Sequence, residues 1–151
     1  MGEAYFYHLI RQPLEAALPV LLEKALAAGW RVAVRGRDAE QMEWLDRKLW
    51  LGPEESFLPH GLAGGAQDAD QPVLLTCESG PAANDPACLM VLSGAPLGPD
   101  EVKRMQRVCV LFDGADPAAM EQARACWKAL TAAGCAAQYW SDESGRWEKK
   151  A

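Results

Sequence analysis

The N-terminal part of the chain places a helical pattern between two strand-like segments, and this arrangement constrains the fold most. Residues 3–10 are aromatic-rich and partly alternating, as expected of a strand. Residues 13–28 predict a helix, because apolar side chains recur there at three- and four-residue steps. Pro13 suits its first turn and Gly29 suits its C-cap. Since residues 30–34 form a second strand-like run, the segment predicts two parallel strands joined by a helix.

The same alternation continues along the rest of the chain. Asp38 is a candidate N-cap for a second helix that carries Met42, Leu45 and Leu49. Further strands are predicted at residues 73–76, 89–92, 107–112 and 136–140, and further helices at 100–104 and 117–133, the last closed by Gly134. This order predicts an α/β fold, a three-layer α/β/α Rossmann-like sandwich with a largely parallel sheet. We expect a single domain over residues 1–140 and a polar C-terminal tail over residues 141–151.

Charge and hydropathy disfavour two classes of partner. The net charge is −6, from 15 basic and 21 acidic residues, and this disfavours strong direct binding to nucleic acid because lysine and arginine supply most of that affinity. No apolar run approaches the roughly 20 residues of a membrane span. The N-terminus shows no basic region leading into a long apolar stretch, so we predict a cytoplasmic protein.

Cysteine and histidine usage predicts neither a disulfide framework nor a metal centre. The five cysteines are odd in number and include no CxxC pair. The two histidines, His8 and His60, do not stand beside cysteine or acidic residues at metal-ligand spacing. We therefore expect no metal and no cofactor.

Catalytic and nucleotide-binding motifs are missing from their usual positions. The first strand leads into IRQPLEAA where a dinucleotide-binding protein has a glycine-rich turn, and GLAGG lacks the lysine and hydroxyl residue of a phosphate loop. His60, within FLPHG, is the candidate general base, with no activated nucleophile in view. A small hydrolase or nucleotide-dependent transferase, using His60 with a carboxylate from the long loop, remains an alternative. The acidic pairs Glu54–Glu55 and Asp142–Glu143 are predicted to be solvated surface.

Two clusters are candidate binding surfaces. Residues 51–71 are rich in proline and glycine, and apolar side chains on or beside them either cover the core or form an exposed partner patch. In the last predicted helix, Arg124, Trp127 and Lys128 stand at positions i, i+3 and i+4 and therefore share one face. This face is either a solvated surface or a cradle for a peptide that carries an aromatic side chain and carboxylates.

Several segments resemble the chi subunit of bacterial DNA polymerase III holoenzyme over nearly the full chain. They are FYHL in the first strand, WRVAV after the first helix, LDRKLWLGPEESFLPHGLAG at residues 45–64, and WKAL with a following AAG in the last helix. The resemblance implies a Rossmann-like domain without an active site. It also implies a heterodimer with the psi subunit, which connects chi to the clamp loader, and binding of the acidic C-terminal tail of single-stranded-DNA-binding protein.

The resemblance also assigns residues to these two contacts. It implies a psi-facing region made of Trp50, Phe57, Pro59, His60 and Leu62. It implies a tail-binding pocket that contains Arg124, Trp127 and Lys128. The chain departs from better-known members at three positions: Trp127 stands where tyrosine is common, and Asp113 and Gly114 stand where apolar residues are usual.

Overall fold

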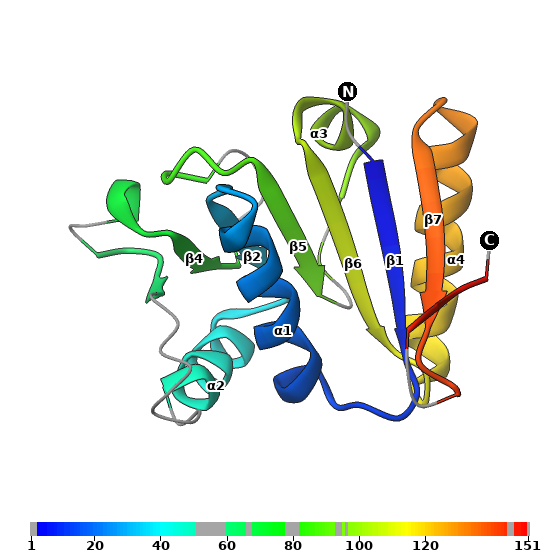
Figure 1. Ribbon diagram of the computed structural model, residues 1–151, viewed down its shortest axis with the longest axis horizontal. Coiled ribbons are helices and arrows are strands. Elements are labelled where there is room, and N and C mark those ends of the chain that lie inside the picture. The colour runs from blue at the N-terminus through cyan, green and yellow to red at the C-terminus, as the bar shows by residue number, and fades with distance from the viewer. Residues whose placement is uncertain are drawn as a thin grey trace.

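The computed structural model describes residues 3–50, 60–65, 68–77, 82–92, 95, 97–144 and 147–150 (Figure 1). The helices are α1 (Leu14–Ala27), α2 (Ala39–Trp50), α3 (Pro99–Arg104) and α4 (Pro117–Ala132), with a 3-10 turn η2 (Asp68–Asp70). The strands are β1 (Glu3–Leu9), β2 (Val32–Arg35), β3 (Gly61–Leu62), β4 (Val73–Thr76), β5 (Cys88–Leu92), β6 (Arg107–Asp113), β7 (Ala136–Ser141) and β8 (Glu148–Lys149).

Within the described residues, the strands form one eight-stranded sheet in the order β3-β4-β2-β5-β6-β1-β7-β8. Neighbouring strands are parallel, apart from β7 and β8, which are antiparallel. β1 lies between β6 and β7, so that Phe6 has Val110 and Tyr139 as its register partners. The prediction of an α/β fold with a largely parallel sheet is confirmed.

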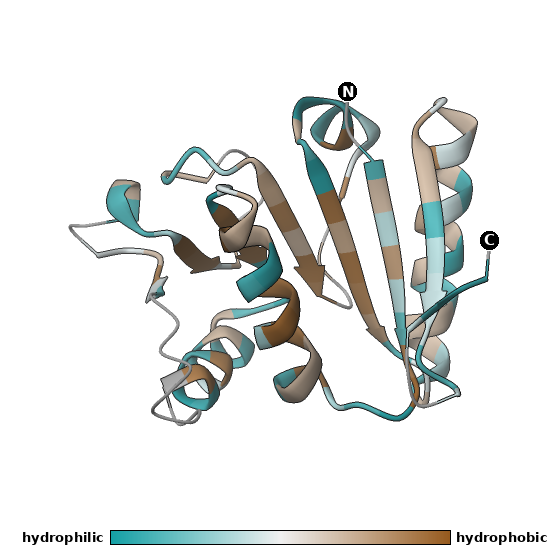
Figure 2. Ribbon diagram, viewed as in Figure 1, coloured by the Kyte–Doolittle hydropathy of each residue, from teal (hydrophilic) through white to brown (hydrophobic). Residues whose placement is uncertain are grey.

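The two faces of the sheet contribute to two separate cores, since successive side chains of a strand point to opposite faces. Val32 and Val34 of β2 belong to a core that also contains buried residues of α1 and α2. Ala33, between them, belongs to a second core with residues of α3 and α4. Figure 1 shows α1 and α2 on the near side of the sheet and α4 behind β7. Figure 2 shows hydrophobic residues concentrated in the central strands β5 and β6.

Short strands at the two ends of the sheet depart from the prediction. Residues 51–71 were expected to lack regular structure, yet β3 lies within them and pairs with β4. The backbone N–H of Ala63 then donates to the carbonyl of Leu75 at 2.8 Å. A strand of two residues has no alternation to detect, so its formation depends on the neighbouring strand rather than on local pattern.

Local signals set both ends of α4, with Pro117 and Gly134 at the predicted positions and Asp116 as an N-cap that was not predicted. Asp116 caps the helix, since its Oδ1 accepts a hydrogen bond from the N–H of Ala118 at 3.0 Å. Pro117 occupies the first turn, where a missing N–H has no cost. Gly134 follows the helix with φ at 85°, a left-handed conformation that favours glycine. These signals fix where α4 begins and ends.

Candidate functional site

A pocket of about 340 Å³ lies between α4 and the sheet. Its lining residues come from α4 and from three adjacent strands, β6, β1 and β7. They are Phe6, Phe112, Met120, Ala123, Arg124, Trp127, Lys128 and Tyr139. The three side chains singled out on the last helix are thus brought together on one pocket, which we call the α4 pocket.

Aromatic rings form the wall of the α4 pocket. The indole of Trp127 meets the ring of Phe6 edge-on, with centroids 5.3 Å apart and planes at 71°. Trp127 also meets Tyr139 edge-on at 6.2 Å and 78°, and Tyr139 lies 6.1 Å from Phe112. Edge-to-face pairs of this kind are favourable beyond the area they bury. The wall therefore holds the half-buried Trp127 in a defined orientation.

Two cations border this apolar wall. Arg124 and Lys128 are exposed and stand one helical turn apart on α4. Among the residues that the structure describes, neither side chain forms an ion pair. Arginine can hold a carboxylate through two parallel hydrogen bonds, whereas lysine acts as a point charge. The pocket thus suits a ligand with an apolar ring and a nearby anionic group.

Sequence reasoning missed most of the pocket wall. Phe6, Phe112 and Tyr139 belong to three different strands, and Met120 lies one turn before Arg124. Alternation along β1 could have placed Phe6 on a buried face. The strand order that brings Phe112 and Tyr139 beside it has no local signal, because it depends on which strands pair.

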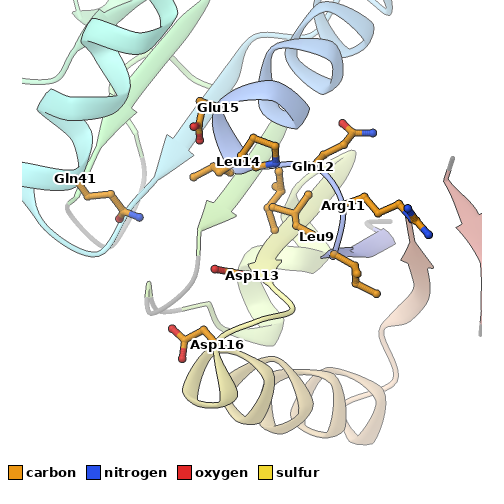
Figure 3. A pocket seen from close by; sticks show the side chains of 11 residues that line it. Leu9, Arg11, Gln12, Leu14, Glu15, Gln41, Asp113 and Asp116 are labelled. Carbon is orange, nitrogen blue, oxygen red and sulfur yellow. The ribbon is translucent and has the colours of Figure 1, made fainter. Parts of the chain in front are cut away.

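A second cleft, of about 500 Å³, lies at the carboxyl ends of β1 and β6. Ligands of open parallel sheets usually bind at such an edge, where successive connections leave toward opposite faces. Here α1 follows β1 on one face and α4 follows β6 on the other. Figure 3 shows Glu15, Gln41, Asp113 and Asp116 around this cleft. Its three carboxylates outnumber the one cation that lines it, Arg11, and this balance disfavours a phosphate.

The loop after β1 is anchored by a carboxylate of the chain itself. Oδ1 of Asp142 accepts hydrogen bonds from the N–H groups of Ile10 at 2.7 Å and Arg11 at 3.1 Å. Its Oδ2 accepts from the N–H of Gln12 at 2.9 Å. Dinucleotide-binding folds use the N–H groups of the corresponding turn to hold a pyrophosphate. In this protein the N–H groups of the loop donate to Asp142 instead.

Asp142 corrects one prediction from the sequence. It was expected to be solvated, but the residue is 0% exposed. Burial by itself raises the pKa of this carboxyl, and the hydrogen bonds from the loop outweigh it, so the pKa is lowered. The donors come from the other end of the chain, so no local pattern could indicate them.

The described members of the predicted psi-facing region, His60 and Leu62, lie near the opposite end of the sheet. His60 is buried at the start of β3, with Nε2 3.2 Å from Oδ1 of Asp46 on α2. Leu62 on β3 is 36% exposed. Trp50 ends α2, but its side chain lies outside what the structure describes, as do Phe57 and Pro59.

The described residues hold neither a metal-binding cluster nor a membrane-spanning helix. In that part of the chain, no group of three or more His, Cys, Asp or Glu side chains is arranged to hold a metal ion. Over the same residues, no helix is both long and apolar enough to cross a membrane.

Fold and site together define an α/β domain with a cation-bordered aromatic pocket outside the usual nucleotide-binding edge of its sheet. The chain belongs to the family described as DNA polymerase III chi subunit, HolC, whose family model matches residues 1–138. The resemblance drawn from the sequence is therefore confirmed. Family membership supports an accessory role in DNA replication, within a DNA polymerase III complex.

Curated relatives agree with this family. The chain is 25% identical over 119 residues to the probable DNA polymerase III subunit chi of Rickettsia prowazekii, covering 75% of this chain and 71% of the relative. It is 44% identical over 46 residues to the DNA polymerase III subunit chi of Escherichia coli, covering 30% of this chain and 31% of that relative.

Proposed function

We propose that this protein is a non-catalytic accessory subunit of the DNA polymerase III clamp-loader assembly. In this proposal it links the psi subunit to the acidic C-terminal tail of single-stranded-DNA-binding protein. The α4 pocket is the observation that carries the proposal, because Arg124 and Lys128 border an aromatic wall there. Family membership supports its place in the replication machinery.

The chemistry of the α4 pocket matches the end of an acidic peptide. A terminal aromatic side chain would pack against Trp127 and the rings around it, and its carboxylate would pair with Arg124. The net charge of −6 opposes long-range attraction of an acidic partner. Binding therefore relies on the two local cations, and it weakens with added salt without vanishing.

The second contact is proposed at the other end of the sheet. Trp50, Phe57, Pro59, His60 and Leu62 form the proposed psi-facing region. β3 is the strand at one edge of the sheet, whereas α4 packs beside β7 near the other edge. Two partners on these regions would not compete for the same surface, as a bridging subunit requires.

The proposal extends to architecture and location. Helices that pack in two cores, one for each face of the sheet, support a three-layer Rossmann-like arrangement. We place the protein in the cytoplasm, where a replication subunit acts. The acidic net charge supports recruitment to DNA through other proteins rather than by strong direct binding.

The alternative, a hydrolase or transferase that uses His60, has less support. The imidazole is fully buried, and among the described residues its acidic partner is Asp46 on α2. A general base must reach the proton that it removes. In the same way, Asp142 holds the N–H groups of the loop that would otherwise be available to a phosphate.

Calorimetric titration with an acidic peptide that ends in Pro-Phe tests the proposal. A hydrogen bond to a charged group contributes about 1.5–3 kcal/mol, so Arg124→Ala should weaken binding by about ten- to a hundredfold. Blocking the terminal carboxylate as an amide should have a similar effect on wild type. Arg104→Ala, which removes an exposed cation from α3, is the matched control. If Arg124→Ala binds the free-acid peptide as tightly as wild type does, the α4 pocket is not the tail site.

A further inference from the structure

His8 of β1 contacts two of the rings that line the α4 pocket, those of Phe112 and Tyr139. Its imidazole stacks on Phe112, with centroids 5.0 Å apart and planes at 18°. Its Nδ1 is hydrogen-bonded to the hydroxyl of Tyr139 at 2.6 Å. His8 does not line the pocket itself, but it can influence a bound ligand through Tyr139.

The far side of the His8 ring is closed. Its Nε2 is buried and has no hydrogen-bond partner among the described residues. Gly114 packs so closely that a Cβ at this position would lie 2.3 Å from Nε2. This contact leaves no room for a side chain at position 114. The packing leaves Tyr139 as the polar contact of the ring.

Charges around His8 come from three elements. Arg124 reaches it from α4, Asp113 from the end of β6, and Asp142 and Glu143 from the end of β7 and the residues after it. Burial is the largest effect and lowers the pKa of His8, Arg124 lowers it further, and the three carboxylates oppose both. The net pKa lies below the usual value of about 6.5.

An anion bound at Arg124 changes the balance of charges that act on the His8 ring. It neutralises the guanidinium that disfavours a charged imidazole, and it adds a negative charge on the same side. A charged imidazole donates from both nitrogens, so the oxygen of Tyr139 must then accept from Nδ1. In the charged state the hydroxyl proton of Tyr139 is therefore free to donate to a ligand, since Tyr139 lines the pocket.

We propose that His8 is a positioning residue that sets the charge specificity of the α4 pocket. It is neutral while the pocket is empty, and its ring gains one proton from solvent when a carboxylate pairs with Arg124. The inference rests on the proposed function, since it concerns the same pocket. It adds that proton uptake and ligand binding are linked through Tyr139.

Thermodynamic linkage between proton binding and ligand binding fixes the direction in which pH changes ligand affinity. If the ligand raises the pKa of His8, protonation of His8 must raise ligand affinity by the same factor. Affinity therefore increases as pH falls through the range between the pKa of the bound state and that of the free state. A shift of about one pKa unit corresponds to a change of up to about tenfold in affinity. Peptide carboxylates stay ionised above about pH 5.5, so they do not mask the effect.

The test combines titration calorimetry with proton NMR of the histidine rings. The free-acid and amide-blocked forms of the acidic Pro-Phe peptide are titrated at pH 6 and pH 8 into wild type, His8→Gln and Tyr139→Phe. We expect wild type to bind the free acid about three- to tenfold more tightly at pH 6. We expect His8→Gln to bind with no pH dependence, and Tyr139→Phe to lose most of it. Saturation with peptide should raise the pKa of His8 in the NMR titration.

The outcomes separate this inference from the proposed function. Peptide binding that is equal at pH 6 and pH 8 in wild type, with sensitivity to Arg124→Ala, overturns the role of His8 and leaves the tail site in place. pH dependence that persists in His8→Gln also overturns it. Absence of binding in wild type at both pH values removes the proposed function and this inference together.

Discussion

The indole of Trp127 meets the ring of Phe6 edge-on at 5.3 Å, which joins α4 to the middle of β1. One side chain thus contributes both to the second core and to the wall of the α4 pocket. Truncation to alanine in a fully buried site costs about 3–5 kcal/mol, and a half-buried tryptophan should cost less, about 2 kcal/mol.

Substitution of Trp127 should change both the stability of the fold and the binding of the peptide. We expect Trp127→Ala to lower the free energy of unfolding by about 2 kcal/mol and to weaken peptide binding by at least about tenfold. Trp127→Phe should retain most of both, because it keeps an aromatic ring against Phe6. Urea unfolding and calorimetry measure the two quantities. Full binding by Trp127→Ala would show that the ring has no contact with the peptide.

The buried ion pair between β2 and α3 should make the stability of the fold depend on pH. Arg35 is 2% exposed and pairs with Glu101 through two hydrogen bonds, at 2.8 and 2.6 Å. Removing one partner of such a pair costs about 3–5 kcal/mol, so Glu101→Gln should be strongly destabilised at pH 7. Replacing both residues, as Arg35→Met with Glu101→Leu, should recover part of the loss.

The sign of the pH effect follows from the pKa of Glu101. The hydrogen bond from Arg35 lowers this pKa, although burial opposes the shift. A carboxyl with a lowered pKa in the folded state stabilises the fold above its unfolded-state pKa, and this stability is lost as pH falls through the folded-state value. Wild type and Glu101→Gln should therefore converge in stability below about pH 4. A constant difference between pH 7 and pH 3 in urea unfolding would contradict this explanation.

Asp142 should stabilise the loop after β1. An asparagine keeps one acceptor oxygen but loses the charge and the acceptor for Gln12, so Asp142→Asn should destabilise the protein by about 2–3 kcal/mol at neutral pH. Glu143→Gln, a neighbouring exposed carboxylate, is the matched control and should change stability by less than about 0.5 kcal/mol. Hydrogen exchange of the amides of Ile10 and Gln12 should accelerate in Asp142→Asn alone. Equal exchange in both variants would argue against the anchoring role.

The proposed psi-facing region is tested by loss of association without loss of fold. Replacing both Trp50 and Phe57 by alanine should weaken binding of a psi subunit and leave the thermal unfolding midpoint nearly unchanged. Leu62→Ser should weaken binding in the same direction. Val20→Ser, at a position 47% exposed on α1, removes an exposed apolar side chain elsewhere and should bind normally. A double variant that unfolds would show that these two residues belong to the core.

Local sequence signals predicted the helices and most strands of this protein. Asp116, Pro117 and Gly134 place the ends of α4, and the spacing along it puts Arg124, Trp127 and Lys128 on one face. Such signals act within a few residues, because capping, φ preference and helical period depend on near neighbours. The family resemblance likewise rested on contiguous segments, which a sequence displays directly.

Tertiary structure alone decided what these elements surround. β1 lies between β6 and β7, and this order brings Phe6, Phe112 and Tyr139 against α4 to make a pocket from a helix face. It also brings the buried Asp142 to the loop after β1, which a polar segment near the C-terminus gave no reason to expect. Strand order and long-range polar contacts depend on how the whole chain buries its apolar surface and satisfies its backbone donors, and neither condition is written in a short stretch of sequence.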